Sequence, residues 1–449
     1  MIAEIDRTTT TPDAEDEWLR AGLRVVDASA TQRIVAFRDS IELDAFLRRL
    51  GEYEGGPSEG RRNPPHLSFF DGIISLRPYG PEDRASRSLR ESLVEQPERP
   101  HLVDVELWYP GSAETAVEWM TAVSESIRER GGTIVDSLLG ESTGLVLLRM
   151  RAPGAALTEL LEADVVAEMD EVTIAPSALI HAGSIDAQSL PELPSPDPDV
   201  PLVGVIDTGI QAAHPIMAGT VYDALAIETG EDGADRHGHG TAAASVVVWG
   251  DIAASIGRHA WQTPHCSVLS VKVLDRQNQL PSEKLPEKQL AEAIRVCAAQ
   301  GARIINLSLG DLTSPLRGRG GTRLASVIDS LARELDLVIV MPTGEISPGE
   351  YRTALSDDFA EGYIQQLYDY ENGRVLDPAH AAIALTVGGT VAADQVTRSG
   401  IKPIGKSGWP SPISRRGPGI NGALKPELSA PAGTLAPSEP GCSSPGHST

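Results

Sequence analysis

The second half of the chain alternates apolar, strand-like runs with helix-like stretches, and this alternation constrains the fold more than any other feature. Because a helix separates successive strands, we expect an α/β fold whose parallel sheet carries helices on both faces. Functional groups in such sheets gather at the carboxyl ends of the strands. The expected strands are Leu202 to Ile206, Val268 to Leu274, Ile304 to Leu309, Leu337 to Val340 and Ile383 to Val387, and the expected helices are Thr241 to Trp249, Pro286 to Gln300 and Arg323 to Leu335.

A smaller unit is predicted in front of this sheet. Residues 101–178 follow the order β-α-β-β-α-β, which is typical of a ferredoxin-like α+β domain. The prolines that follow it indicate an extended linker. The predicted organisation is a region of unclear fold at 1–100, a ferredoxin-like domain at 101–180, a proline-rich linker at 181–201 and the parallel-sheet domain at 202–449.

Composition excludes several classes of function. The formal net charge of −25 argues against nucleic acid as a partner, because phosphate neutralisation needs clustered Lys and Arg. The N-terminal residues contain acids and no apolar core of a secretory signal, and no window is long and apolar enough to cross a membrane. We therefore expect a cytoplasmic protein without membrane contact.

The cysteines give no sign of a disulfide framework or a metal site. There are three of them, widely spaced, and they form no C-x-x-C pair; they are Cys266, Cys297 and Cys442. No acidic loop is strong enough to assign a calcium site. The sequence predicts no metal and no organic cofactor.

One short motif ends the first strand of the large sheet. In Val203-Gly-Val-Ile-Asp-Thr-Gly209 an apolar strand delivers Asp207 to the sheet edge, and Gly209 allows the chain to turn. Asp-Thr-Gly also occurs in aspartic proteases, but these need a second carboxylate motif, which the sequence lacks. An isolated turn aspartate is the structural alternative.

A second motif follows at Asp235-Arg-His-Gly-His-Gly-Thr241, before a run of small residues suited to a helix packed under a sheet. His239 lies between two glycines, which leave room for a substrate. His237 and His239, with Asp235, are also candidate metal ligands, although no further ligand cluster follows them.

Together the two motifs resemble the subtilisin-like serine protease family (peptidase S8), in which Asp, His and Ser occur in this chain order. The resemblance covers about 202–433 and continues through motifs in the family's order: Val271 to Leu274, Arg303 to Gly310, Ala384 to Gly388, Ser414 to Gly419, Lys425 to Leu428 and Ala430-Pro431.

The resemblance implies a serine endopeptidase that hydrolyses peptide bonds through an acyl-enzyme. His239 takes the proton of the serine hydroxyl and later gives it to the leaving amine. Asp207 fixes the tautomer of the His239 imidazole. Ser308, Leu309 and Gly310 pair their backbone with an extended peptide or protein substrate. Asn306 is expected to be structural.

Two departures from the family pattern bear on activity. Glu345 stands where the family has an oxyanion-binding Asn, and an ionised carboxylate donates no hydrogen bond; protonation of a buried Glu345 restores a donor. The segment after Ala430-Pro431 lacks the nucleophile motif and its helix, which leaves part of the core uncovered. Ser448 is a weak candidate nucleophile. We therefore expect the nucleophile segment to be missing or altered, and the alternative is a non-catalytic pseudo-protease that binds extended peptides.

The predicted ferredoxin-like domain leaves two alternatives open. In the family such a domain often acts as a propeptide that assists folding and inhibits the enzyme. It is otherwise a permanent accessory domain. A cut within 180–201 of the purified chain favours the first, and a stable full-length chain favours the second.

Overall fold

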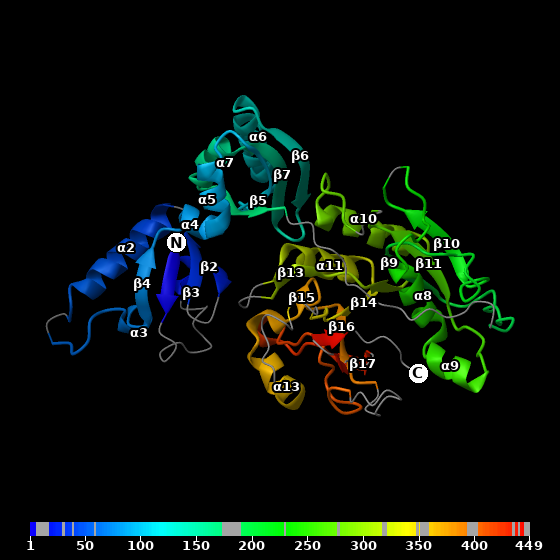
Figure 1. Ribbon diagram of the computed structural model, residues 1–449. Helices are drawn as coiled ribbons and strands as arrows, with labels where there is room; N and C mark the ends of the chain where they lie inside the picture. The colour runs from blue at the N-terminus through cyan, green and yellow to red at the C-terminus, as the bar shows by residue number, and fades with distance from the viewer. Residues whose placement is uncertain are drawn as a thin grey trace.

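The fold is described from a computed structural model of the chain (Figure 1). The structure describes residues 1–5, 18–28, 32–37, 40–57, 60–172, 190–228, 230–275, 279–316, 321–346, 350, 359–392, 403–432, 436–438 and 441–443. Residues 181–189 of the predicted linker and Ser448 lie outside this part of the chain.

The largest element is a seven-stranded sheet in which every neighbouring pair is parallel. The expected strands all belong to it, with two more at its edges. In spatial order the strands are β10 (Val221–Ala226), β11 (Ser267–Lys272), β9 (Leu202–Asp207), β12 (Ile304–Leu307), β14 (Val338–Pro342), β16 (Leu385–Thr390) and β17 (Leu428–Pro431).

Helices cover both faces of this sheet, as the sequence predicts. On one face, α10 (Pro286–Ala299) and α11 (Arg323–Glu334) bury an aliphatic core with the strands. Gly204 permits the close approach of α10, since a Cβ at this position would lie 2.8 Å from Cys297 Sγ. On the other face, α8 (His239–Trp249) packs on β9 and β11 and is followed by α9 (Ile252–Arg258). The expected α/β class is confirmed.

The face that carries α8 is only partly covered. Over β12, β14 and β17 the apolar side chains Ile304, Val338 and Leu428 are 43%, 45% and 55% exposed. Strands of a parallel sheet are normally buried on both faces. Among the described residues no helix lies over this area, so part of the expected core is open to solvent there.

A second, four-stranded sheet has the ferredoxin-like arrangement. Its order is β6-β7-β5-β8 with antiparallel neighbours, and its two helices pack on one face around an apolar core. Its elements are β5 (Pro100–Leu107), α6 (Ala113–Glu129), β6 (Thr133–Gly140), β7 (Leu145–Pro153), α7 (Gly154–Leu161) and β8 (Val166–Glu171).

The N-terminal region, which the sequence left without a fold, contains a third sheet with the order β2-β3-β1-β4. Its core gathers aromatic rings that are rare elsewhere in the chain, with Phe46 in contact with Phe37, Phe69 and Phe70. The elements are β1 (Ile2–Ile5), β2 (Leu23–Ala28), β3 (Gln32–Phe37), α2 (Ser40–Glu54), α3 (Leu67–Phe70) and β4 (Ile73–Arg77), and then α4 (Pro81–Arg84) and α5 (Arg87–Glu95).

The free face of the ferredoxin-like sheet rests on the N-terminal ends of α10 and α11 (Figure 1). Asp136 of β6 accepts a hydrogen bond from the backbone N–H of Leu285 at 3.0 Å, where a carboxylate is favoured by the helix dipole. Arg323, the first residue of α11, pairs with Asp170 at 2.7 Å. Burial raises the pKa of Glu106 beside it. Charges at two helix ends therefore fix the position of this domain.

A smaller antiparallel pair, β13 (Asp311–Pro315) and β15 (Leu376–Asp377), lies beside the start of α11. Thr322, which caps α11, donates its hydroxyl to Asp377. Burial outweighs this hydrogen bond and raises the pKa of Asp377 to about 7. The remaining elements are α13 (Phe359–Asp369), single turns of 3-10 helix at Glu371–Gly373 and Ile420–Gly422, and the hairpin β18 (Ala436–Ser438) and β19 (Gly441–Ser443). In the described part of the chain no helix has the length and apolar character needed to cross a membrane.

Replacing Arg149 tests the contact between the two domains. Its side chain is 3% exposed, pairs with Asp104 at 2.7 Å and donates to the carbonyls of Ser282 and Lys284 at 2.9 and 2.5 Å. Arg149→Met leaves these acceptors without a donor, and breaking a buried pair costs about 3–5 kcal/mol. We expect a lower urea midpoint and faster proteolysis between the domains. As a control, Arg87→Met removes one member of an exposed ion pair and should shift the midpoint little. Equal shifts in both variants would contradict the assignment.

The raised pKa of Asp377 makes stability depend on pH. The folded state keeps a proton on this carboxyl between its usual value of 3.8 and about 7. The contribution of this carboxyl to the free energy of unfolding is therefore complete below pH 3.8 and is lost as pH rises through 7. The free energy of unfolding falls in this range by at most about 1.4 kcal/mol per pH unit. Asp377→Asn should flatten this slope between pH 4 and 7 in urea titrations. Asp199→Asn, at an exposed position, serves as control, and an unchanged slope in Asp377→Asn would refute the claim.

Candidate active site

Asp207 is the last residue of β9, at the carboxyl edge of the large sheet. Its side chain is completely buried, and Oδ1 accepts a 2.7 Å hydrogen bond from the N–H of Thr208. The chain then turns at Gly209, whose φ of +103° favours glycine. A Cβ on Gly209 would also lie 2.6 Å from the carbonyl oxygen of Gly233, so the turn brings the loop before α8 against the end of β9.

His239 is the first residue of α8 and lies directly against Asp207. Its Nδ1 is 2.6 Å from Asp207 Oδ1, and its side chain is 5% exposed. Burial disfavours the imidazolium, but the hydrogen bond and charge of Asp207 outweigh burial and raise the pKa of His239. Glu345 and Asp235 act in the same direction. This geometry holds Nδ1–H toward Asp207 and leaves Nε2 to exchange a proton with a reacting group.

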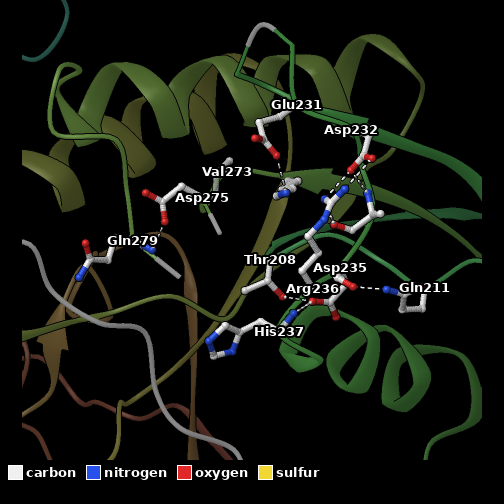
Figure 2. Close-up of polar contacts among 12 residues, drawn as sticks. Thr208, Gln211, Glu231, Asp232, Asp235, Arg236, His237, Val273, Asp275 and Gln279 are labelled. Atoms are coloured by element: carbon white, nitrogen blue, oxygen red, sulfur yellow. Dashed lines mark hydrogen bonds and ion pairs between the residues drawn. The ribbon is translucent and has the colours of Figure 1, made fainter. Parts of the chain in front are cut away.

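The candidate metal ligands of the sequence are engaged differently: His237 is exposed, whereas Asp235 and His239 are buried and have separate partners. Asp235 accepts hydrogen bonds from Thr208 and from the N–H of His237, as Figure 2 shows, and also from Gly238 and Thr241. His239 is engaged with Asp207. No group of three or more metal-ligating side chains lies together in the described ranges.

The residues predicted to pair with substrate, Ser308 to Gly310, follow the carboxyl end of β12. Leu309 is 8% exposed, so its side chain belongs to the core and only its backbone is available to pair with a substrate. Ser308 donates its hydroxyl to Asn306 Oδ1 at 2.9 Å. A cavity of about 320 Å³ opens beside these residues at the strand ends, lined by Asn306, Ser308, Ile413, Ser414 and residues 340–345, 387–389 and 430–432.

Glu345 lies in the loop after β14 and lines the same cavity. Its backbone forms an isolated antiparallel bridge with Ser414. Burial raises the pKa of the Glu345 carboxyl, and the charge of His239 opposes this shift. The residue predicted at the oxyanion position therefore lies within electrostatic reach of the predicted base.

One residue at this site escaped the sequence analysis. Leu376 of β15 is 1% exposed and donates its N–H to Thr343 O at 3.1 Å. A Cβ on Gly344 would lie 2.4 Å from Leu376 Cδ1, and one on Gly310 would lie 3.4 Å from it. Leu376 thus fills the space between the predicted substrate segment and the loop that carries Glu345. Leu376 stands in none of the motifs, so no local pattern signals this role.

Of the predicted residues, Asp207 and His239 are in direct contact, and Glu345 and Ser308 share one cavity. Ser448 lies outside the described residues. The hydrogen-bond network centred on Asp235 was also missed, although its Asp and Thr residues stand inside the two motifs.

Models of three known protein families match separate parts of the chain. A model of the subtilase family matches residues 199–448. Two further models match the front of the chain, the Y4kK N-terminal domain at residues 2–80 and the Y4kK central domain at residues 83–171.

Curated relatives match parts of the chain. The uncharacterized protein y4kK of Sinorhizobium fredii (strain NBRC 101917 / NGR234) is 29% identical over 212 residues, which are 46% of this chain and 67% of y4kK. The uncharacterized protein y4bN of the same strain is 35% identical over 33% of this chain. Thermitase from Thermoactinomyces vulgaris is 33% identical over 24% of this chain. The chain spans only 35% of the length of y4bN and 37% of that of thermitase.

Solved structures give a weaker likeness. The epidermin leader peptide processing serine protease (EpiP) from Staphylococcus aureus has a TM-score of 0.41 at 14% identity, over 75% of this chain and 76% of that one. The prenylagaramide maturation protease PagA has a TM-score of 0.32 at 20% identity, over 55% of this chain and 68% of that one. At these TM-scores neither structure informs the assignment. The family model, in contrast, spans more than half of the chain and includes both Asp207 and His239, and the chain therefore belongs to the subtilase family of subtilisin-like serine proteases.

Proposed function

We propose that the chain is a serine endopeptidase in which His239 is the general base and Asp207 its orienting carboxylate. The observation that carries this proposal is the buried 2.6 Å contact between His239 Nδ1 and Asp207 Oδ1. A carboxylate in this place fixes the tautomer of the imidazole and stabilises the cation that forms when a serine hydroxyl loses its proton. The position of Ser308 to Gly310 beside the cavity supports an extended peptide as the substrate.

The serine, His239 and water each take part in one step of the proposed peptide hydrolysis. A serine hydroxyl gives its proton to His239 Nε2 as its oxygen attacks the peptide carbonyl. His239 then donates that proton to the leaving amine, which leaves an ester between the serine and the acyl part of the substrate. Water later hydrolyses this ester. Ser448 is retained as the candidate nucleophile that the sequence supplies. No cofactor is required by these steps.

Glu345 supports the second candidate function, a pseudo-protease that binds peptide without cleaving it. A carboxylate beside the developing oxyanion repels it when ionised, and the loss of one donor alone costs about 10²–10³ in rate. Its burial raises its pKa, so the protonated form, which donates, persists to higher pH than for an exposed glutamate. Catalysis is thus confined to pH values at which His239 is neutral and Glu345 is protonated.

Labelling with a fluorophosphonate probe, followed by mass spectrometry of the labelled peptide, tests the nucleophile directly. We expect one labelled serine in the full-length chain, with labelling lost in His239→Ala and hydrolysis of a mixed peptide library reduced about 10⁴-fold in Asp207→Asn. Ser448→Ala decides whether Ser448 is the labelled residue. Peptide binding in fluorescence anisotropy without labelling or hydrolysis would reject the endopeptidase and support the pseudo-protease.

Glu345→Gln tests the oxyanion position. Glutamine keeps the size of the side chain and always offers an N–H donor. The wild-type rate should follow a bell-shaped pH profile, since the active form needs both a neutral His239 and a protonated Glu345. The variant should lose the alkaline limb. At pH values where the wild-type rate has fallen, its kcat should exceed that of the wild type by about 10²–10³. Identical pH profiles for the two proteins would place Glu345 outside the oxyanion site. Glu334→Gln, at an exposed glutamate that lies 3.8 Å from Arg295, is the control.

The role of the ferredoxin-like domain is a separate question within this proposal. Its contacts through Arg149, Asp136 and Arg323 are numerous and partly buried, which favours a domain that stays bound to the large sheet. Intact-mass measurement of the purified chain distinguishes the alternatives. A mass for the full chain supports an accessory domain, whereas a cut within 180–201 supports a propeptide.

A further inference from the structure

The carboxylate of Asp235 is the centre of a hydrogen-bond network beside the His239–Asp207 pair. Figure 2 shows its contacts with Thr208 and His237. Asp235 is 1% exposed. Its Oδ1 accepts from Thr208 Oγ1 at 3.0 Å and from the N–H groups of His237 and Gly238 at 2.8 Å each. Its Oδ2 accepts from Thr241 N at 2.9 Å and Thr241 Oγ1 at 2.6 Å. Both carboxylate oxygens therefore accept hydrogen bonds, from Thr208 at the end of β9 and from the start of α8 and the loop before it.

These partners lie next to the proposed catalytic pair in the chain. Thr208 directly follows Asp207, and its Oγ1 also accepts from Gly240 N, the residue after His239, at 2.8 Å. Thr241 lies two residues beyond His239 and accepts a hydrogen bond from Gln211 N at 3.0 Å. Asp235 thus joins the end of β9 to the start of α8 on both sides of the contact between Asp207 and His239.

The same carboxylate corrects an electrostatic disadvantage of His239. As the first residue of α8, His239 sits at the positive end of the helix dipole, where a cation is disfavoured. The N-cap residue Gly238 has no side chain to cap the helix, and Asp235 accepts hydrogen bonds from the backbone there instead. Burial opposes ionisation of Asp235, but the hydrogen bonds from Thr241, Gly238 and His237 outweigh burial and lower its pKa, which keeps it ionised at neutral pH.

Three carboxylates act on His239 from the elements around it. Asp207 comes from the end of β9, Glu345 from the loop after β14, and Asp235 from the loop before α8. Asp235 has both oxygens held by backbone and hydroxyl donors, so its charge is fixed in place. The exposed Asp232 in the same loop pairs instead with Arg236 at 2.7 Å.

We propose that Asp235 is a positioning residue for the proposed reaction, holding His239 in line with Asp207 and stabilising the imidazolium that forms during catalysis. The catalytic part of this inference rests on the proposed function. The effect on the imidazole itself does not, because it exists in the free protein.

Asp235→Asn tests the charge in the full-length chain. Two-dimensional NMR of the histidine rings, with His239→Gln to assign the resonance, gives the pKa of His239 without any substrate. We expect Asp235→Asn to lower this pKa and to reduce kcat by about tenfold to 10²-fold with little change in KM. Asp232→Asn removes a carboxylate from the same loop and should leave both values as in the wild type.

Asp235→Glu separates position from charge and remains informative if the Asn variant does not fold. It keeps the negative charge but displaces the oxygens, so the pKa of His239 should stay near the wild-type value while kcat falls about tenfold. An unchanged kcat in Asp235→Glu would overturn the positioning role, and a His239 pKa that is equal in Asp235→Asn and Asp232→Asn would overturn the charge role. Absence of all hydrolysis in the wild type would reject the proposed function, while the NMR result would still decide the effect of Asp235 on His239.

Discussion

The contact between the Asp207 carboxylate and the His239 imidazole is the interaction on which the candidate site depends. Removing both groups from water is unfavourable unless each finds a partner, and here each is the main partner of the other. The pair forms because β9 and α8 meet at the carboxyl edge of a parallel sheet, where the turn at Gly209 allows the loop before α8 to approach. Asp235 then fixes that loop through donors on both elements.

The ferredoxin-like sheet is connected to this site through the large sheet. It contacts the starts of α10 and α11, and the strands under those helices end beside the cavity. The charges at the contact are complementary: acids of the small sheet meet the N-terminus of α10 and Arg323 of α11. The domain therefore rests on helices that pack against the strands leading to Ser308 and Glu345.

The opposite face of the large sheet contrasts with this well-packed side. There α8 covers β9 and β11, while Ile304, Val338 and Leu428 remain exposed. The cavity at the carboxyl ends of the same strands adjoins this area and includes Glu345. The candidate pair of Asp207 and His239 thus lies where α8 covers β9, and the part of the same face over β12, β14 and β17 carries no helix among the described residues.

The sequence by itself determined the class of fold and the two motifs. Strand and helix periods predicted the parallel sheet, its covering helices and the ferredoxin-like order, because these depend on local apolar spacing. Asp207 and His239 were found because each stands in a short motif at a strand end or helix start. The first sheet of the chain was missed, since its strands are short, β1 and β4 lie far from the other two in the chain, and its aromatic core forms only through distant contacts.

Only the tertiary structure decided which of the motif residues meet and what surrounds them. The 2.6 Å contact, the hydrogen bond from Thr208 to Asp235 and the place of Leu376 between Gly310 and Gly344 join residues far apart in the chain. The raised pKa values of Glu345 and Asp377 likewise follow from burial, which no local pattern encodes. Local spacing fixes secondary structure, whereas distances and desolvation at a site arise from the packing of the whole chain.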